Sequence, residues 1–401
     1  MPATTASAAR LAIVAVSLFL LWRVFHVNVG LYENTGQPRL AAFPVPAADS
    51  AGAPKAGEKA ALGRLLDDNP AEVAALLAFA RERETAGDVA GASKAYRVAL
   101  DVAPLHRETL ARASAHFLRQ EQPEGLDLLA RLVESYPGTR DRAFPVLAEL
   151  LAGHRYRAQL SKIASRNPAW LDPFVAYACT RGTDPSLLAP LALQVSSAAK
   201  VPSRAAACVV DRLRVAGRWE QAYHLWLNLL PKERRTRLGF VFNGGFDFPA
   251  SNMGFDWTIS QDAERRVGHT AEIVRLPGAE GARALRVAYN GGRQAGVPAR
   301  QYLLLAPGRY ELRGLARPQG IKAARGIYWT VRCVQGDKIG KIVARSDRFL
   351  GAADWQPFSM PVEIDGACGG YSLQLEPVAE EGQIAFVSGS AWFDDLVLWR
   401  R

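Results

Sequence analysis

The stretches Val241-Phe242-Asn243-Gly244-Gly245-Phe246-Asp247 and Ala391-Trp392-Phe393-Asp394-Asp395-Leu396-Val397-Leu398 decide the fold of the C-terminal part of the chain. They open and close a region in which apolar residues recur with a period of two. Turn residues return about every 8–12 positions within it. This combination is typical of an all-β sandwich, so residues 237–401 are expected to form one β-domain of antiparallel strands.

Candidate strands lie between the turns of this region. Each is a short run in which apolar and polar residues alternate, and Pro307-Gly308 marks the turn between two of them. The runs cover residues 284–289, 301–305, 309–317, 327–333, 356–362, 371–375 and 391–398.

The order of motifs in this region resembles that of galactose-binding-like β-sandwiches, the fold of many carbohydrate-binding modules. The opening Asn243 to Asp247 is followed by Gly254-Phe255-Asp256-Trp257, and the closing motif comes last. Between them stand Pro-Gly-x-Tyr-x-Leu-x-Gly from Pro307 and Asp-Trp-Gln-x-Phe from Asp354. The resemblance covers roughly residues 238–401 and implies a jelly roll of two antiparallel sheets.

A sugar site is implied by the same resemblance, either across the concave sheet or on the loops at one edge. Sugars bind through aromatic faces and through planar polar side chains that bridge hydroxyl groups. Tyr328 and Trp329 are consecutive in one strand, so only one of them can face a ligand. For each aromatic residue the alternative is packing in the core. The candidates are Trp329, Tyr371, Tyr328, Tyr289, Asn290, Gln374 and Arg332.

A structural calcium ion is often found in this family where the first and last strands run side by side. The matching acids are Asp247 and Asp395, with Asp394 adjacent. Carboxylate and carbonyl oxygens suit calcium, but Asp247 replaces the more usual glutamate. The alternative is two surface aspartates that flank a strand. Calcium is the only cofactor that the sequence suggests.

The four cysteines fall into two regional pairs, Cys179 with Cys208 and Cys333 with Cys368. No C-x-x-C or Cys/His spacing indicates zinc. In an oxidising compartment each pair could form a disulfide, and Cys333 and Cys368 lie in strands of the same predicted sandwich. The alternative is four buried free thiols, because sequence does not show whether the Cα atoms come within bridging distance.

The sequence contains no constellation typical of an enzyme. It lacks a Gly-x-Ser-x-Gly motif, a phosphate-cradling glycine loop and a zinc motif. Asn243-Gly244-Gly245 and Asn290-Gly291-Gly292 are turn signals. A glycosidase needs two carboxylates that face each other across a cleft, and no such pair is recognisable. We therefore expect a protein that is not an enzyme.

Helical periodicity characterises residues 62–236. Apolar residues recur at intervals of three and four, which predicts amphipathic helices. A pattern recurs along this region: a small residue, then an aromatic or apolar residue, then a small or apolar residue, and finally a proline. It resembles the second helix of tetratricopeptide repeats, and a solenoid of such repeats usually binds a partner protein. The alternative is a stalk that braces the β-domain. The pattern is met by Ala92, Tyr96, Ala99 and Pro104, by Gly125, Leu129, Leu132 and Pro137, by Tyr156, Leu160, Ile163 and Pro168, and in part by Ala222 and Trp226.

An apolar run covers Leu11–Trp22 near the N-terminus, about the length of a signal-peptide h-region and short for a spanning helix. A helix that continues to Leu31 reaches spanning length, and no small-residue cleavage site follows the run directly, which favours an uncleaved anchor over a cleaved signal peptide. We expect a signal anchor at residues 11–31, with residues 1–10 in the cytoplasm and a Pro/Ala-rich linker at 32–61. This places the protein in a bacterial inner membrane as a single-pass protein with its bulk in the periplasm.

The formal net charge of +10 is spread along the chain, and no basic helix or aromatic-basic motif of a nucleic-acid reader is present. Nucleic acid is therefore not an expected partner. We expect a non-catalytic glycan-binding scaffold that assists assembly or export of a cell-surface polysaccharide, with an envelope protein bound to the solenoid. The alternative is a structural subunit of an envelope complex whose sandwich docks protein. Exposed aromatics on the concave sheet would favour the first, and an apolar or Arg-rich sheet the second.

Overall fold

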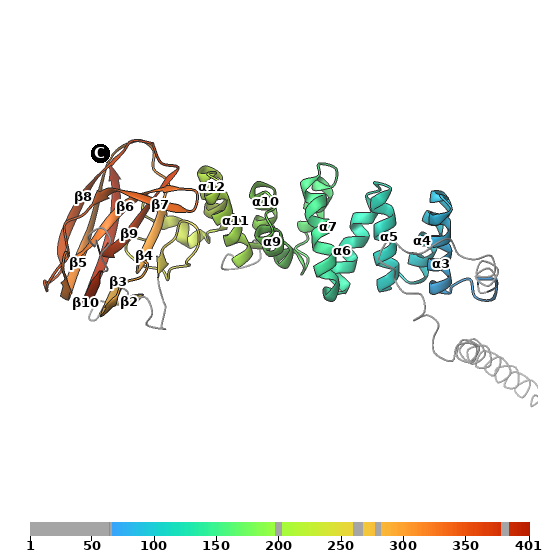
Figure 1. Ribbon diagram of the computed structural model, residues 1–401, viewed down its shortest axis with the longest axis horizontal. Coiled ribbons are helices and arrows are strands. Elements are labelled where there is room, and N and C mark those ends of the chain that lie inside the picture. The colour runs from blue at the N-terminus through green and yellow to red at the C-terminus, as the bar shows by residue number, and fades with distance from the viewer. Residues whose placement is uncertain (1–63, 65, 197–202, 260–267, 277–281, 378–384) are drawn as a thin grey trace, which may run out of the picture. The chain divides into compact units, whose positions relative to one another are not determined.

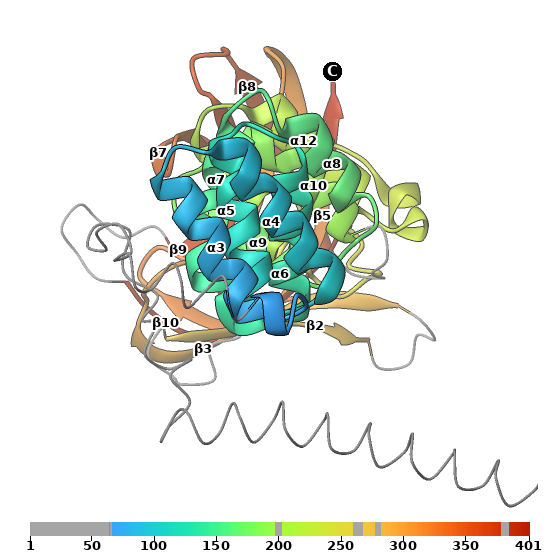
Figure 2. The same ribbon diagram turned by 90° about the vertical axis from the view of Figure 1, so that its right-hand side faces the viewer.

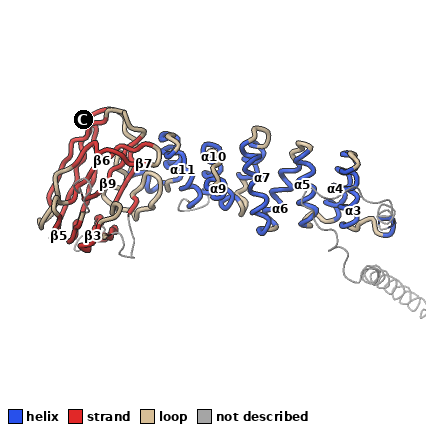
Figure 3. Tube along the Cα trace, viewed as in Figure 1, coloured by secondary structure: helices blue, strands red, loops and turns tan. Residues whose placement is uncertain are grey.

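The computed structural model describes residues 64, 66–196, 203–259, 268–276, 282–377 and 385–401. The chain divides into two compact units, Met1–Leu132 and Val133–Arg401, and the division falls inside one helix. Helices precede strands along the chain, as Figure 3 shows. Of the predicted fold, the coarse order of a helical region followed by a two-sheet antiparallel sandwich is confirmed.

Helices of the first unit begin and end at recognisable signals. Asp88 caps a helix because its carboxylate accepts a hydrogen bond from the Gly91 N–H at 2.8 Å. The preceding turn contains Gly87 with φ of 75°, a conformation that favours glycine. The first two helices lie side by side (Figure 2). The helices are α3 (Val73–Thr85), α4 (Val89–Val102), α5 (Arg107–Arg119) and α6 (Glu124–Ser135).

Positions of the predicted repeat pattern lie where helices of this unit meet. Ala92, Tyr96 and Ala99 on α4 are buried. A Cβ atom on Gly125 would lie 2.6 Å from the backbone nitrogen of Leu118, so the close approach there requires glycine. The small residues thus permit helix contact. Membership of the tetratricopeptide class stays a prediction.

The second unit begins with short helices whose apolar faces are buried, including Phe174 and Trp170 in ring contact at 6.0 Å. Its helical elements are η2 (Pro137–Thr139), α7 (Arg140–Ala152), α8 (Arg157–Ala164), α9 (Leu171–Thr180), α10 (Pro185–Ser196), α11 (Arg204–Val215), α12 (Trp219–Leu229) and η3 (Lys232–Arg237).

Two five-stranded sheets follow in the same unit, here named sheet A (order β1-β4-β9-β6-β7) and sheet B (order β2-β3-β10-β5-β8). Neighbouring strands in both sheets are antiparallel, and Figure 1 shows the two layers. The strands are β1 (Thr258–Ile259), β2 (His269–Arg275), β3 (Arg283–Arg293), β4 (Ala299–Leu303), β5 (Gly308–Ala323), β6 (Ile327–Gln335), β7 (Lys338–Arg345), β8 (Gln356–Ile364), β9 (Gly370–Pro377) and β10 (Phe386–Arg400).

The core of the sandwich is built around aromatic rings from both sheets. Trp329 on β6 lies 5.7 Å from the Trp257 ring and 5.3 Å from the Phe393 ring, between centroids. The motif segments that open and close the region lie side by side, because the Leu396 N–H donates to the Gly244 carbonyl at 3.0 Å. A side chain on Gly244 would overlap the Leu396 carbonyl, which explains the glycine in the opening motif.

Helices α11 and α12 pack on the sandwich. Trp219, the first residue of α12, covers Gly370 at the start of β9. Arg214 on α11 lies 4.0 Å above the Tyr302 ring of β4 and donates to the Gly336 carbonyl between β6 and β7 at 3.3 Å. The compact unit Val133–Arg401 therefore contains these helices together with the sandwich.

Both cysteine pairs form disulfides in the structure. The Cα atoms of Cys179 and Cys208, on α9 and α11, are 6.4 Å apart. Those of Cys333, on β6, and Cys368, just before β9, are 5.5 Å apart. Both distances lie in the usual range for disulfides.

The localisation predicted from the N-terminal sequence, a single span of the inner membrane, is corrected by the structure. In the described part of the chain, no helix has the length and apolar character needed to cross a membrane. The longest of these helices, α4, has 14 residues, fewer than the roughly 20 that a span requires. The segment Leu11–Leu31 and the linker 32–61 lie outside the described residues.

Candidate functional site: the polar face of sheet A

The outer side of sheet A carries a set of polar residues that we name the polar face. Trp329 and Val331 of β6 belong to the core, so Thr330 and its alternating neighbours point to the other side. The same alternation applies to β9 and β4, whose core residues include Leu373 and Ala299. The polar face consists of Arg300, Tyr328, Thr330, Arg332, Arg345, Ser372, Gln374 and Glu376.

Strand register brings these residues into line across the sheet. Arg300 on β4 pairs with Gln374 on β9, which pairs with Thr330 on β6, which in turn pairs with Arg345 on β7. Residues in directly opposed positions lie on the same side of a sheet and within contact range. One continuous row of polar side chains therefore crosses the sheet from β4 to β7.

Several buried polar atoms of the face have no hydrogen-bond partner among the described residues. They are Oε1 of Gln374, Oγ of Ser372 and Nε of Arg300. Gln374 is only 3 % exposed. Buried polar atoms in folded proteins nearly always have a partner, so this row retains hydrogen-bonding capacity that the protein itself does not use.

The more exposed part of the face combines an aromatic ring with charged groups. The guanidinium of Arg345 lies 5.0 Å from the centroid of the Tyr328 ring. Arg332 forms an ion pair with Glu376, with 2.7 Å between Nε and Oε1. Thr330 donates to the same carboxylate oxygen at 2.5 Å. Oε1 of Glu376 is thus held by two donors, whereas Tyr328 is partly exposed and Arg345 is exposed.

Helix α11 borders the polar face at its β4 side. Oδ1 of Asp211 on this helix lies 3.8 Å from Nε of Arg214, and the charge of Arg300 is also near this carboxylate. Arg300 also lies 5.2 Å from the Tyr302 ring, the same ring that Arg214 covers. Residues of the helical region therefore contribute charge to the surroundings of the face.

The structure brings together three of the sequence-predicted sugar contacts, Tyr328, Arg332 and Gln374, and separates the rest. Trp329 is fully buried and Tyr371 is 1 % exposed, both in the core. Each occupies a position of the strand that points inward, so its ring is covered by the opposite sheet. We do not carry these two residues into the site.

Tyr289 and Asn290 lie on β3 of sheet B, away from the polar face. Tyr289 is buried, and its ring is in edge contact with His269 at 6.2 Å. Asn290 is exposed, and its Oδ1 accepts from the Gly292 N–H at 2.9 Å, which is turn chemistry. These residues therefore do not join the other candidates.

Sequence reasoning missed Arg300, Thr330, Arg345, Ser372 and Glu376. The signal for Thr330 was present, because placing Trp329 in the core assigns its neighbours to the outer side. Arg300 and Arg345 come from strands paired at long range, and single-sequence patterns do not fix that register.

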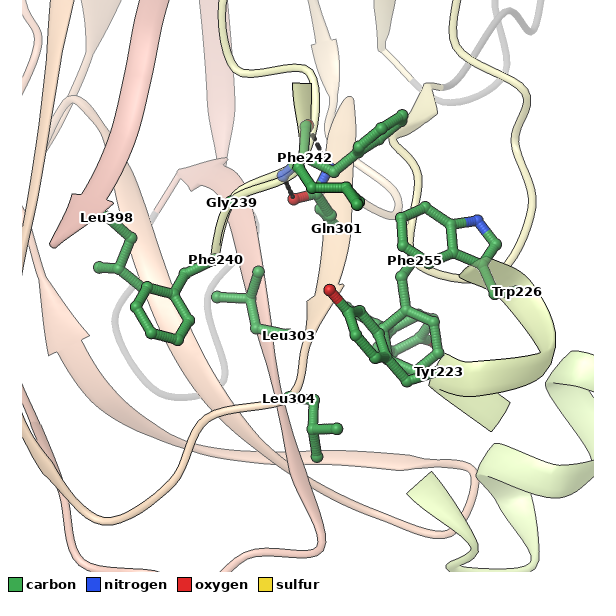
Figure 4. Close-up of a pocket in the computed structure, with 12 residues that line it drawn as sticks. Tyr223, Trp226, Gly239, Phe240, Phe242, Phe255, Gln301, Leu303, Leu304 and Leu398 are labelled. Atoms are coloured by element: carbon green, nitrogen blue, oxygen red, sulfur yellow. Dashed lines mark hydrogen bonds between the residues drawn. The ribbon is translucent and has the colours of Figure 1, made fainter. Parts of the chain in front are cut away.

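An aromatic pocket lies beside the sandwich where it meets α12, with a volume of about 450 Å³ (Figure 4). Its polar side chain Gln301 is already used, donating to and accepting from the backbone of Phe242 at 2.9 Å each. Few planar polar groups remain to bridge hydroxyls, so the pocket suits an apolar group better than a sugar. The pocket is lined by Tyr223, Trp226, Leu238, Gly239, Phe240, Phe242, Phe255, Gln301, Tyr302, Leu303, Leu304 and Leu398.

Trp392 provides an aromatic surface on sheet B. Its Nε1 donates to Oε1 of Gln319 at 3.0 Å, and the Arg286 guanidinium lies 5.8 Å from its ring. It is partly exposed and stands outside the core. Trp392 is thus one aromatic alternative to Tyr328 as a sugar platform, and Trp399 of the same strand is another exposed ring.

The predicted calcium ligands lie around the opening motif. A Cβ atom on Gly245 would be 3.6 Å from a carboxylate oxygen of Asp247 and equally far from one of Asp395. Asp247 also forms an ion pair with Arg237 at 3.2 Å. In the part of the chain that the structure describes, no three His, Cys, Asp or Glu residues form a metal-binding group. A cation here would need backbone oxygens as well.

A hydrogen-bonded Ser–His–Glu network lies in the first unit. Oγ of Ser93 is 2.8 Å from Nε2 of His116, and Nδ1 of His116 is 2.6 Å from Oε1 of Glu84. Arg119 donates to the same glutamate oxygen at 2.8 Å. Ser93 and His116 are buried among helices, so the network joins α3, α4 and α5 and leaves the serine inaccessible to a substrate.

No protein-family model and no curated protein matches the chain. Among solved structures, the chain is similar to a CBM4 structure at 16 % identity with a TM-score of 0.30, over 40 % of this chain and 99 % of that one. It is similar to a putative sugar-binding protein from Bacteroides thetaiotaomicron (13 % identity, TM-score 0.30, 41 % and 100 % covered). It is also similar to TmCBM61 in complex with β-1,4-galactotriose (16 % identity, TM-score 0.26, 41 % and 99 % covered).

Proposed function

We propose that the protein is a non-catalytic binder of oligosaccharide or polysaccharide and that the sugar lies on the polar face of sheet A. The observation that carries this proposal is the row of polar side chains from Arg300 to Arg345, which strand register aligns across sheet A. Sugar hydroxyls both donate and accept, so they suit the accessible β6–β7 part of this row, where the exposed Arg345 lies near the Arg332–Glu376 pair.

Tyr328 is the proposed stacking platform, because it is partly exposed, whereas Arg214 covers Tyr302, another partly exposed aromatic residue on this side of sheet A. A sugar on Tyr328 would meet the Arg332–Glu376 pair, which offers a donor and an acceptor in fixed positions. Fixed polar groups beside an apolar surface are the usual composition of a small-molecule site.

The experiment is a glycan array with the full chain, followed by titration of the best ligand against variants. Tyr328→Ala is expected to weaken binding by about 1–3 kcal/mol, as for a modest hot spot. Trp392→Ala, on the opposite sheet, is the matched control and is expected to leave the affinity unchanged. Loss of binding in the Trp392 variant alone would move the site to sheet B and overturn the proposed location.

A protein-docking role is the second candidate function, because the polar face is rich in arginine and the aromatic pocket exposes Leu238 and Phe240 at 43 % and 42 %. Exposed apolar surface of this kind often marks a protein interface. A folded full-length chain that retains no glycan on the array would favour this role. That the helical region holds a partner protein also stays a hypothesis.

A calcium ion held by Asp247 and Asp395 is a further part of the proposal. The two carboxylates flank Gly245, whose lack of a side chain leaves room between them. Calcium would have to replace Arg237 as the partner of Asp247. Its role would be structural, since it would join the opening segment to β10.

A further inference from the structure

The charge of the polar face is strongly one-sided. Arginine side chains lie on it or at its border, and the acids there are Glu376, which Arg332 neutralises, and Asp211, which lies near Arg214 and Arg300. The excess of positive charge is concentrated in a partly buried surface, where screening by salt is weaker than in open solvent. The arginines are Arg214, Arg300, Arg332 and Arg345.

Arg345 is the key residue because no described acid pairs with it. Its contact is with the Tyr328 ring, 5.0 Å from the centroid, and it is exposed. A guanidinium held against an aromatic ring keeps its donors free for a carboxylate, which it binds in a bidentate manner. A ligand that stacks on Tyr328 would place its substituents beside this group.

Arg300 provides a second cationic donor in the same row. Its Nε is buried and has no partner among the described residues. Arg300 and Arg345 lie at the two ends of the row, with Gln374 and Thr330 between them. A ligand that covers the row would therefore have one cation at each end. Repeated negative charges along a ligand would therefore match the face.

We infer that the ligand of the polar face is an anionic saccharide, one that carries carboxylate groups as uronic acids do. This inference rests on the proposed glycan-binding function and specifies its substrate class. Stacking on Tyr328 would provide contact with the sugar ring, and Arg345 would discriminate in favour of the charged form.

The test uses the full chain and three acidic polymers: polygalacturonate, alginate and a glucuronate-bearing xylan. Each is compared with its own carboxyl-reduced, neutral form in affinity electrophoresis and calorimetry. At least one acidic polymer is expected to bind about tenfold more tightly than its neutral form, as for loss of one charge-assisted hydrogen bond. The preference should fall as salt is raised.

Single-residue variants test whether Arg345 causes the preference for the acidic over the neutral polymer. Arg345→Gln is expected to remove the preference for the acidic form, and Arg345→Lys to retain part of it because the charge remains without the planar fork. Arg286→Gln is the matched control, since Arg286 also lies over an aromatic ring, but on sheet B. It is expected to leave the preference intact.

The outcomes separate this inference from the function on which it rests. Equal or tighter binding of the neutral forms would overturn the anionic class and leave glycan binding in place. A preference that survives in Arg345→Gln but is lost in Arg286→Gln would also overturn it. Retention of neither acidic nor neutral polymers, by protein shown to be folded, would count against the proposed function itself.

Discussion

The six-membered ring of Trp219 is centred over Gly370. A Cβ atom on Gly370 would lie 2.5 Å from three alternate atoms of that ring, Cε2, Cε3 and Cη2, so only a glycine permits the contact. Trp219 begins α12 and Gly370 begins β9. This pair packs α12 directly against sheet A.

Gly370→Ala is therefore expected to destabilise the second unit, by about 1–3 kcal/mol as for other overpacked sites. The added methyl group must push the Trp219 ring away from the sheet. Chemical denaturation followed by tryptophan fluorescence measures the change. Gly138→Ala is the control, since a Cβ atom there meets nothing within 4 Å. Equal stability of both variants would show that the contact is not a close one.

The role of Gly370 shows where prediction from sequence ended. Turn residues and a period of two were enough for the sandwich, and the residues around Asn243 and Leu396 were correctly placed side by side. Nothing in the sequence indicated the role of Trp219, because its partner Gly370 lies 151 positions further on, in β9. Contacts at such separation leave no local pattern in one sequence.

Site residues were predictable only in part for a related reason. Chemistry suitable for sugars selected Trp329, Tyr371 and Tyr328 alike, but the side of the strand separates them. Tyr328 and Trp329 are consecutive, so they point to opposite sides of the strand, and Trp329 is the one that is fully buried. Polar partners such as Arg345 became visible only through the pairing of β6 with β7.

The Ser93–His116–Glu84 network is expected to stabilise the first unit. His116→Ala leaves the buried Ser93 hydroxyl without its histidine partner and removes one of the groups that contact the Glu84 carboxylate, at a cost of about 1–3 kcal/mol. Urea denaturation followed by circular dichroism measures this. His106→Ala, at the exposed start of α5, is the control and should cost less. A smaller loss in the His116 variant than in the His106 variant would contradict this role.

The Cys333–Cys368 disulfide is expected to contribute about 2–4 kcal/mol to stability. It joins β6 to the segment before β9, next to the Trp219–Gly370 contact. The double variant Cys333→Ser, Cys368→Ser should unfold at lower denaturant concentration than the native chain, and native protein should show no alkylation of either thiol under oxidising conditions. Complete alkylation of both thiols in folded protein would show that the bond does not form.

The Asp394 carboxyl provides a pH-dependent test of the proposed calcium site. Burial raises its pKa to about 6, with the charges of Asp395 and Asp247 acting in the same direction, while a hydrogen bond from the Asp395 N–H opposes them. Unfolded aspartate has a pKa of about 3.9, so the folded state holds the proton more tightly. The contribution of Asp394 to the free energy of unfolding is full below about pH 4 and is lost as the pH rises through about 6.

The difference in unfolding free energy between native protein and Asp394→Asn is therefore expected to fall between about pH 4 and pH 6. Calcium favours the ionised carboxylates, so millimolar calcium should raise the stability of the native chain above pH 6 and reduce this fall. Asp395→Asn should remove the calcium effect, whereas Asp365→Asn, at an acid outside the site, should preserve it. Thermal unfolding that is unchanged by calcium across this pH range would overturn the calcium proposal and leave Asp394 as a buried acid of the β10 bulge.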